Sequence, residues 1–242
     1  MARSGEKVLV GRTVVVTGAS RGIGLAASRR FAEAGAWVAM VARGEAALRA
    51  AAEEVGGHAI VADVADVGSV ERLAARVREL LGGAPPDIVV NAAGVFELSP
   101  VAETDPESFD RQIAINLRGP FLVIRAFLPG MLARGSGHLI TVGSIAGRRG
   151  FPHNGAYSAS KFGVRGLHAV LDEELRGTGV RATLVEPAAT DTPLWEGIDR
   201  ARHPGLPPRE AMLRPEAVAD AIVYAATRPP EVGVRSIVVE RS

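Results

Sequence analysis

Two side chains suited to proton transfer, Tyr157 and Lys161, lie four residues apart in the chain. Both are rare residue types here, because the 28 basic residues include only two lysines and the chain has only two tyrosines. Residues four apart on a helix share a face. The pKa of a free phenol is about 10, too high for ready proton exchange at pH 7, and a fixed cation nearby lowers it. The pair predicts a tuned general acid/base, with an ordinary exposed helix turn as the alternative.

A second chemical signal is the glycine-rich turn Gly18-Ala-Ser-Arg-Gly22-Ile-Gly24, which follows a short β-branched run and opens a helical stretch. Glycines at such a turn let the backbone approach a pyrophosphate, and the helix N-terminus favours its negative charge. The turn therefore predicts nucleotide binding. The alternative is a glycine-rich turn that only ends a strand.

The end of the second predicted strand indicates which dinucleotide would bind. That strand ends in Val41-Ala42-Arg43, with Ala42 where an acid for the ribose 2′-hydroxyl of NAD would be expected. Arg21 in the glycine turn and Arg43 are guanidinium groups suited to a 2′-phosphate. The sequence therefore predicts NADP, unless both arginines are simply solvated surface residues.

Strands and helices alternate along the whole chain. Short apolar runs that stop at glycine, asparagine or aspartate predict strands, and longer stretches with helical spacing predict helices. The predicted strands are residues 12–17, 36–42, 58–62, 86–90, 138–142, 180–186 and 237–240. The predicted helices run from the glycine turn to residue 35, and over residues 45–55, 69–81, 106–132, 155–175 and 215–227, with a disturbance at Gly119-Pro120 left open.

This alternation predicts an α/β fold, a doubly wound, Rossmann-like parallel sheet with helices on both faces. No linker or composition break divides residues 1–242, so we expect a single domain. Residues 187–210 contain five prolines and little periodicity. We therefore expect a substrate loop or lid at about residues 188–212.

Composition excludes several other classes of protein. The chain is 47% hydrophobic and 23% charged, with a net charge of +1, so nothing predicts disorder or nucleic-acid binding. It has no cysteine, and its five histidines show no metal-ligand spacing, so we expect no metal site. No apolar run of about 18 residues predicts a membrane span. A cytoplasmic protein without a membrane partner is the resulting expectation.

Five motifs, in order along the chain, closely resemble those of the short-chain dehydrogenase/reductase family in its short, single-domain form. The resemblance extends from about residue 10 to residue 239. The motifs are Thr17-Gly-Ala-Ser-Arg-Gly22-Ile-Gly24, Asn91-Ala-Ala-Gly94, Asn116, Ser144 and Tyr157-x-x-x-Lys161, with a partial sixth in Pro187 followed by Thr190.

The resemblance implies a role for each of these positions. It makes Tyr157 the general acid in carbonyl reduction, Lys161 the residue that lowers the tyrosine pKa and binds the nicotinamide ribose, and Ser144 the holder of the substrate oxygen. It implies that Asn116 anchors a water molecule that links Lys161 to solvent. It implies that Thr190 binds the carboxamide of the nicotinamide. Asp63 would touch the adenine, and Asn91 and Gly94 would flank the adenosine ribose. The other cofactor residues that it implies are Gly18, Ser20, Arg21, Gly22, Ile23, Gly24, Arg43, Val64, Ala92 and Pro187.

The expected function is hydride transfer between NADP(H) and a small carbonyl or alcohol substrate. A 3-oxoacyl-carrier-protein reductase, with Arg148 and Arg149 meeting an acidic carrier, and a non-catalytic NADP-binding sensor are the alternatives. The substrate pocket is expected to contain Phe96, Ile145, Phe151, His153, Asn154 and Trp195. Two departures from the family are Ala188, where glycine is usual, and a C-terminus without a glycine-rich ending. We also expect a homo-oligomer, a dimer or tetramer, because the helix after Tyr157 is apolar over much of its surface.

Overall fold

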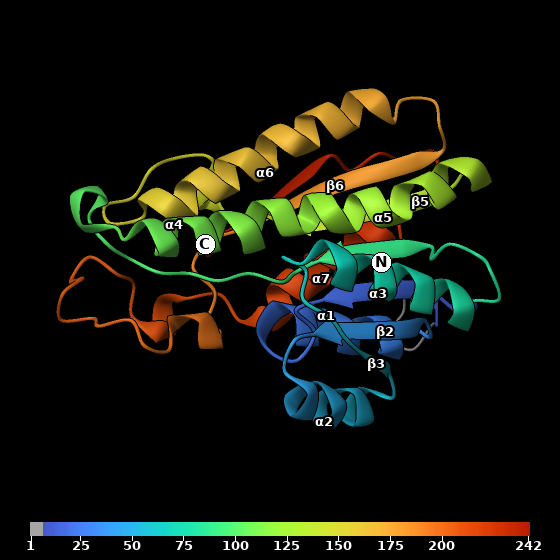
Figure 1. Ribbon diagram of the computed structural model, residues 1–242, viewed down its shortest axis with the longest axis horizontal. Helices are drawn as coiled ribbons and strands as arrows, with labels where there is room; N and C mark the ends of the chain where they lie inside the picture. The colour runs from blue at the N-terminus through green and yellow to red at the C-terminus, as the bar shows by residue number, and fades with distance from the viewer. Residues whose placement is uncertain (1–6) are drawn as a thin grey trace.

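Seven parallel strands form one sheet, in the order β3-β2-β1-β4-β5-β6-β7, in the computed structural model, which describes residues 7–242 (Figure 1). The strands are β1 Thr13–Thr17, β2 Trp37–Ala42, β3 His58–Val61, β4 Ile88–Asn91, β5 Gly137–Val142, β6 Val180–Pro187 and β7 Ser236–Val239. The predicted fold class, a doubly wound parallel sheet in a single domain, is confirmed, and the predicted strand boundaries differ by at most two residues.

Seven α-helices connect and cover these strands. They are α1 Gly22–Glu33, α2 Glu45–Val55, α3 Val67–Leu80, α4 Pro106–Ile113, α5 Gly119–Arg134, α6 Gly155–Glu174 and α7 Pro215–Ala226. The short helical turns are η1 Val101–Glu103, η2 Ala114–Arg118, η3 Ile145–Gly147, η4 Pro193–Trp195 and η5 Arg209–Ala211.

The two faces of the sheet bury two separate cores, because successive side chains of a strand point to opposite faces. On β1, Val14 and Val16 pack in the core beneath α1, α2 and α7, whereas Val15 packs in the core beneath α3, α5 and α6. All three side chains are fully buried. This double burial explains why the strands are continuous apolar runs.

The long helical stretch after β4 is interrupted one turn before the expected position. Pro120 has no amide hydrogen to donate to the carbonyl of Asn116, and the wider π-helical turn η2 lies at this point. The continuous helical stretch from Pro106 to Arg134 is long and apolar enough to cross a membrane by length and composition. Its residues Val123 and Phe127 are buried against the sheet, which is typical of a core helix.

The order in which successive strands are added to the sheet reverses between β1 and β4. Strands β2 and β3 lie on one side of β1, and β4 to β7 lie on the other. At this switch point the last residues of β1 and β4, Thr17 and Asn91, are paired. Parallel sheets bind ligands at such a point, and the segment after β6, orange in Figure 1, projects from the same edge.

Candidate active site

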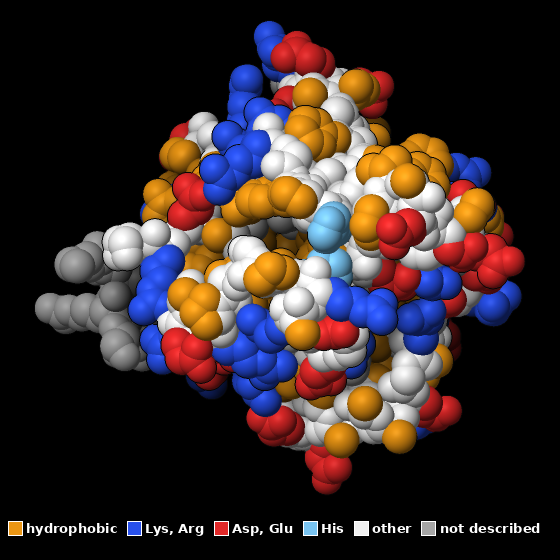
Figure 2. Space-filling view, turned by 90° about the vertical axis from the view of Figure 1, so that its left-hand side faces the viewer, with side chains coloured by type: hydrophobic (Ala, Val, Ile, Leu, Met, Phe, Trp, Pro, Cys, Tyr) orange, Lys and Arg blue, Asp and Glu red, His pale blue; other side chains and the backbone are white. Residues whose placement is uncertain are grey.

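A cleft of about 1020 Å³ opens at the carboxyl ends of the strands. The glycine turn after β1, the ends of β2, β4, β5 and β6, and the segment at residues 187–213 line it. Figure 2 shows the side of the molecule with a hollow that has hydrophobic side chains inside and basic side chains nearby. This volume is at the upper end of ligand pockets, so one cleft has room for a large cofactor and a small substrate.

The glycine turn is built for close backbone approach. Gly18 and Gly22 have positive φ angles of 67° and 57°, which favour glycine. A Cβ atom on Gly18 would lie 2.7 Å from the backbone of Ala93, and one on Gly24 would lie 2.3 Å from the carbonyl oxygen of Gly18. Gly18, Ser20, Arg21, Gly22 and Ile23 line the cleft, whereas Gly24 packs beneath it as the contact between α1 and the turn.

One end of the cleft carries Arg43 and Asp63. Their nearest side-chain N and O atoms are 3.9 Å apart, and 61% of the Arg43 side chain is exposed. The Asp63 carboxylate accepts a hydrogen bond from the backbone N–H of Ala65 at 2.9 Å, which stabilises the turn after β3. Arg43 is therefore held only loosely by Asp63 and is free to meet an added anion.

The residues after β4 form the floor of the cleft. Ala92 and Gly94 line it, and so does Val64 from the turn after β3. Asn91 is buried below, where its side-chain Nδ2 donates to Thr141 at 3.4 Å and its Oδ1 has no protein partner. The structure therefore brings the predicted Asn91 and Gly94 to the same strand end, but only Gly94 faces the cleft.

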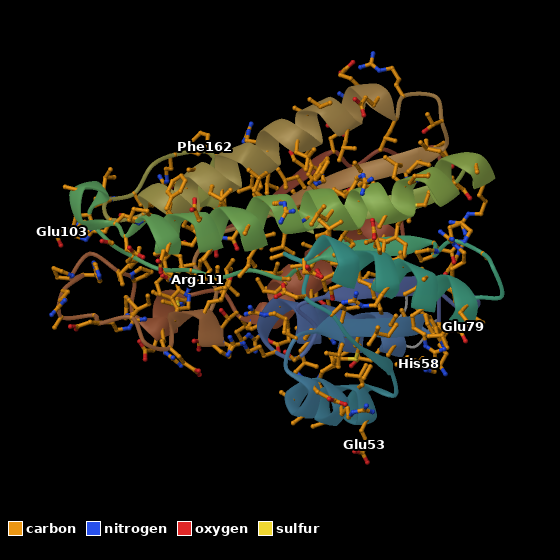
Figure 3. All side chains as sticks on the ribbon, in the orientation of Figure 1. Glu53, His58, Glu79, Glu103, Arg111 and Phe162 are labelled. Atoms are coloured by element: carbon orange, nitrogen blue, oxygen red, sulfur yellow. The ribbon has the colours of Figure 1, made fainter. Side chains whose placement is uncertain are left out.

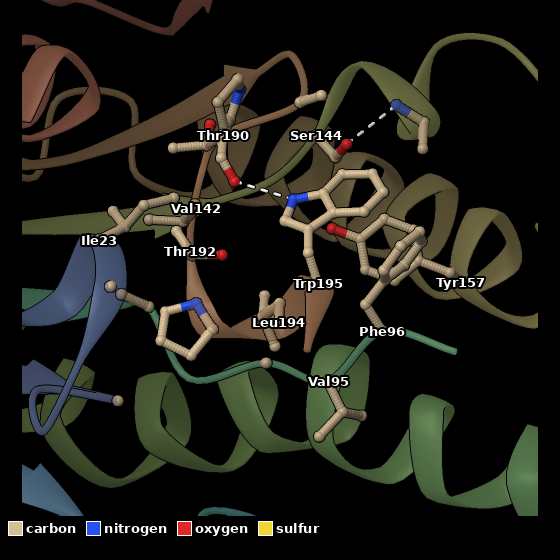
Figure 4. Close-up of a pocket in the computed structure, with 18 of the residues that line it drawn as sticks. Ile23, Val95, Phe96, Val142, Ser144, Tyr157, Thr190, Thr192, Leu194 and Trp195 are labelled. Carbon is tan, nitrogen blue, oxygen red and sulfur yellow. Dashed lines mark hydrogen bonds between the residues drawn. The ribbon is translucent and has the colours of Figure 1, made fainter. Parts of the chain in front are cut away.

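The tyrosine and the lysine lie at the opposite end of the cleft, both on α6. Lys161 is buried, and its Nζ donates to the carbonyl oxygen of Val142 at 2.9 Å. The same Nζ lies 5.5 Å from the centre of the Tyr157 ring. Ser144 caps η3 by accepting the backbone N–H of Ala146 at 3.1 Å, which turns its hydroxyl toward the cleft beside Tyr157 (Figure 4).

Burial opposes charge on both residues of this pair. It raises the pKa of Tyr157 to about 12, against the opposite effect of the Ser144 hydroxyl, and it lowers the pKa of Lys161 to about 8. The expected lowering of the tyrosine pKa by Lys161 is thus wrong for the protein alone. The reason is that desolvation outweighs a cation whose hydrogen bond goes to Val142.

Asn116 is locked in place next to the α6 residues. Its side chain accepts from the backbone N–H of Val95 at 2.8 Å and donates to the Val95 carbonyl at 2.9 Å and to the Ser160 hydroxyl at 3.2 Å. Ser160 in turn donates to the Tyr157 carbonyl at 2.7 Å. Sequence reasoning missed Val95 and Ser160, although Ser160 lies inside the motif that singles out Tyr157.

The family follows from this arrangement and from its match to known proteins. The model of the short chain dehydrogenase family matches residues 12–203, which include the glycine turn, Asn116, Ser144, Tyr157 and Lys161. This chain belongs to the short-chain dehydrogenase family.

Among the described residues, no group of three or more histidine, aspartate or glutamate side chains could hold a metal ion.

Several known proteins are similar over nearly the whole of this chain. An uncharacterized oxidoreductase of Staphylococcus epidermidis is 34% identical over 241 residues, 99% of each protein. Glycine betaine reductase of Emericella nidulans is 38% identical over 240 residues, which are 96% of this chain but only 19% of that protein. The crystal structure of a metagenomic short-chain oxidoreductase in complex with NADP is 34% identical, with a TM-score of 0.82, covering 97% of this chain and 99% of that one.

The segment after β6 closes the Tyr157 end of the cleft in this short-chain dehydrogenase. Pro187 and Thr190 line the cleft, and the Thr190 hydroxyl donates to the Ala188 carbonyl at 2.9 Å. The indole Nε1 of Trp195 donates to the Thr190 carbonyl at 2.9 Å (Figure 4). The predicted loop at residues 188–212 thus contains two short helical turns, η4 and η5.

Five of the six residues expected in the substrate pocket do line the cleft: Phe96, Ile145, Phe151, Asn154 and Trp195. His153 does not. Its Nδ1 lies 2.8 Å from Nδ1 of His203, and the two rings are in contact edge to face. The prediction for His153 is wrong because this side chain joins the loop before α6 to the segment after β6.

A buried carboxylate at the end of β6 was also missed from the sequence. Glu186 is 1% exposed, and its two oxygens accept hydrogen bonds from Arg148 at 2.8 Å and from Arg165 at 3.3 Å. The guanidinium of Arg148 is therefore already bound to a carboxylate of the protein. Arg149 is exposed and lies over the ring of Phe151, 5.0 Å from its centre.

Proposed function

We propose that this short-chain dehydrogenase transfers a hydride between NADP(H) and a small carbonyl or alcohol, with Tyr157 as general acid/base. The observation that carries the proposal is the convergence of the Tyr157 and Ser144 side chains on one cleft, above the buried Lys161. In the direction of carbonyl reduction, NADPH would supply the hydride when it is bound. The protein then has to supply one proton and to support the negative charge that develops on the substrate oxygen.

The residues of the glycine turn fit a dinucleotide. Side chains at Gly18, Gly22 and Gly24 would not fit in this turn, where the backbone must approach a pyrophosphate. Helix α1 begins at the same point. Arg21 and Arg43 would take the 2′-phosphate. The metagenomic relative that was crystallised with NADP supports this choice of cofactor.

At the reacting end, the Tyr157 hydroxyl would donate its proton to the substrate oxygen, and the Ser144 hydroxyl would hold that oxygen by a hydrogen bond. Tyr157 with a pKa of about 12 is protonated at neutral pH, as carbonyl reduction requires. An alkoxide is a far stronger base than a phenolate, so the raised pKa does not prevent the transfer. Lys161 would bind the cofactor ribose, and Asn116 would help to hold the α6 residues in register.

The two alternatives have less support. In a 3-oxoacyl-carrier-protein reductase, Arg148 was expected to meet an acidic carrier, but its guanidinium is bound to Glu186. A sensor that only binds NADP would have no need for Ser144, Tyr157 and Lys161 together. The glycine betaine named for one relative is a zwitterion with a trimethylammonium group, and the arginines around the cleft argue against binding of that cationic group, as described below.

Cofactor choice can be tested by comparing kcat/KM for NADPH and NADH with the same carbonyl. We expect NADPH to be preferred, and Arg43→Ala to weaken NADPH selectively, because only NADPH carries the 2′-phosphate. Arg49→Ala is the matched control, since Arg49 is an exposed arginine on α2 that pairs with Glu45 away from the cleft. Equal or better use of NADH by the wild-type protein would contradict the proposal.

A further inference from the structure

Three aromatic side chains form a corner at the substrate end of the cleft. The ring of Phe96 lies edge to face with Tyr157, at 4.8 Å between ring centres, and edge to face with Trp195 at 5.0 Å. Phe96 therefore connects the proposed proton donor to the segment after β6. We call Phe96, Tyr157 and Trp195 the aromatic corner; Figure 4 shows the three residues together.

The indole of Trp195 is held in this corner by several fixed contacts. Its Nε1 donates to the Thr190 carbonyl, and Thr190 is buried. The guanidinium of Arg200 lies 6.0 Å from the centre of the indole and is itself bound to the Pro207 carbonyl at 2.9 Å. Trp195 is thus a positioned wall of the cleft, not a side chain free to move with solvent.

The rest of the substrate end is mainly apolar. Side chains from four separate segments line it around the aromatic corner: Leu98, Phe151, Leu194 and Leu206. A substrate whose carbonyl oxygen meets Tyr157 and Ser144 must place one of its substituents against these side chains. The surroundings favour an apolar substituent, because an unpaired polar group would lose its hydrogen bonds to water there.

The charges around the corner act against a cationic substrate. Arg200 lies against the indole of Trp195, and Arg149 lies over the ring of Phe151. Each arginine occupies the kind of position that a substrate cation would take over an aromatic ring. Neither Arg149 nor Arg200 forms a salt bridge with a carboxylate among residues 7–242. A positively charged substrate would therefore be repelled at the place where it would otherwise be attracted.

We propose that the substrate is a carbonyl compound with an aromatic ring next to the carbonyl and without a positive charge, and that Trp195 determines this preference. The inference rests on the proposed function. A planar ring attached to the carbonyl carbon packs against the aromatic corner, on the sides of Phe96 and Trp195 that face the cleft. Aromatic pairs in offset or edge-to-face contact gain more than their buried area alone provides, so a saturated ring of similar size is bound less well.

The test compares benzaldehyde with cyclohexanecarboxaldehyde, a pair of similar size that differs in aromaticity. The variant is Trp195→Leu, which keeps an apolar side chain but removes the indole. Because the two aldehydes differ in intrinsic reactivity, the quantity to compare is the ratio of their kcat/KM values with NADPH, wild type against variant. We expect this ratio to fall about tenfold in Trp195→Leu, equivalent to about 1.4 kcal/mol.

The chain offers a matched control, because it has only one other tryptophan. Trp37 lies on β2, where its ring stacks on His58. Trp37→Phe is expected to leave the ratio unchanged. A benzaldehyde that carries a trimethylammonium group in the para position is expected to be reduced at least tenfold less efficiently than benzaldehyde.

A binding measurement removes the dependence on reaction rates. Titration calorimetry with NADPH present, to which an alcohol cannot transfer a hydride, is expected to show benzyl alcohol binding about tenfold more tightly than cyclohexylmethanol to wild type, and the two alcohols binding with nearly equal affinity to Trp195→Leu. Equal affinity of the two alcohols for wild type, or the same aldehyde ratio in Trp195→Leu, overturns the inference. Reduction of aliphatic carbonyls alone also overturns it but leaves the proposed function intact, whereas no hydride transfer to any carbonyl refutes the proposed function itself.

Discussion

At the scale of single residues, burial moves the pKa values of Tyr157 and Lys161 apart. The tyrosine value rises to about 12 and the lysine value falls to about 8, because the low-polarity surroundings disfavour both charged forms. At pH 7 the phenol is therefore protonated and the lysine still carries its charge. This combination suits the proposed carbonyl reduction, in which Tyr157 would give a proton while a cation stands nearby.

The lysine value predicts a pH dependence for the free enzyme. Lys161 loses its charge as the pH rises through about 8, well before Tyr157 loses its proton. We therefore expect kcat/KM for carbonyl reduction to fall above about pH 8, because this parameter reports groups of the free enzyme. Arginine stays charged in that range, so Lys161→Arg should remove the fall.

Lys161→Arg also distinguishes the effect of the positive charge of residue 161 from the effect of its side-chain shape. The planar guanidinium cannot take the place of a compact ammonium that donates to the Val142 carbonyl. We expect kcat at pH 7 to drop by about 10²–10⁴, with little change in Tm. Turnover like that of the wild type in Lys161→Arg would mean that Lys161 serves only as a charge.

Some residue contacts follow from the sequence and others do not. The spacing of Tyr157 and Lys161 is a local, helical relation, so it could be predicted. The bonds from Lys161 to Val142 and from His153 to His203 join segments that are 19 and 50 positions apart. No periodic pattern encodes such pairs, because tertiary packing decides them.

At the scale of elements, α6 and β5 each carry a buried histidine. Burial lowers the pKa of His168 to about 4 and that of His138 to about 3. Neither ring nitrogen of His168 has a hydrogen-bond partner in the protein, whereas His138 lies 2.8 Å from the hydroxyl of Thr183. Both side chains are thus held neutral inside the fold.

These histidines predict a loss of stability in acid. Below about pH 6.5 the two histidines are protonated in the unfolded chain but not in the folded protein. The free energy of unfolding therefore falls as the pH drops toward 4. For His168 the loss amounts to about 2–3 kcal/mol. His168→Met should lose less stability between pH 7 and pH 4.5, as measured by urea unfolding at each pH. The exposed His58→Gln is the control, and identical pH slopes in wild type and His168→Met would contradict the account.

The elements themselves could be predicted well, because the five inner strands are buried on both faces and glycines stand next to several helix ends. The position of the disturbance in the long helix could not. Pro120 marks where the backbone lacks a donor, but the π-helical turn lies before it, where Asn116 bonds Val95 and Ser160. A turn of this kind depends on partners outside the helix.

At the scale of the whole molecule, α5 and α6 lie next to each other and present apolar side chains outward. Val164 and Leu171 of α6 are buried toward the core, whereas Phe162 and Val170 are 46% and 52% exposed. Figure 3 shows Phe162 on the outer side of α6. Phe121 of α5 is also exposed. The helix thus has the two apolar faces that the sequence indicates.

We expect this outer face to pack on a second copy of the chain, in a homo-oligomer with C2 or D2 symmetry. Light scattering at micromolar concentration should give a dimer or tetramer, and Phe162→Glu should shift it toward the monomer by placing charge in an apolar contact. Ala50→Glu, at an exposed position of α2 on the opposite face of the sheet, serves as a charge-matched control. A stable wild-type monomer would contradict the prediction.

The most direct test of the central claim is the rate of NADPH oxidation by Tyr157→Phe, measured with any carbonyl that the wild-type protein reduces. The substitution removes one hydroxyl and keeps the ring that contacts Phe96. We predict a loss in kcat of about 10²–10⁴, as is typical for one proton-transfer group, with unchanged Tm and unchanged affinity for NADPH. Reduction at the wild-type rate by Tyr157→Phe would contradict the account.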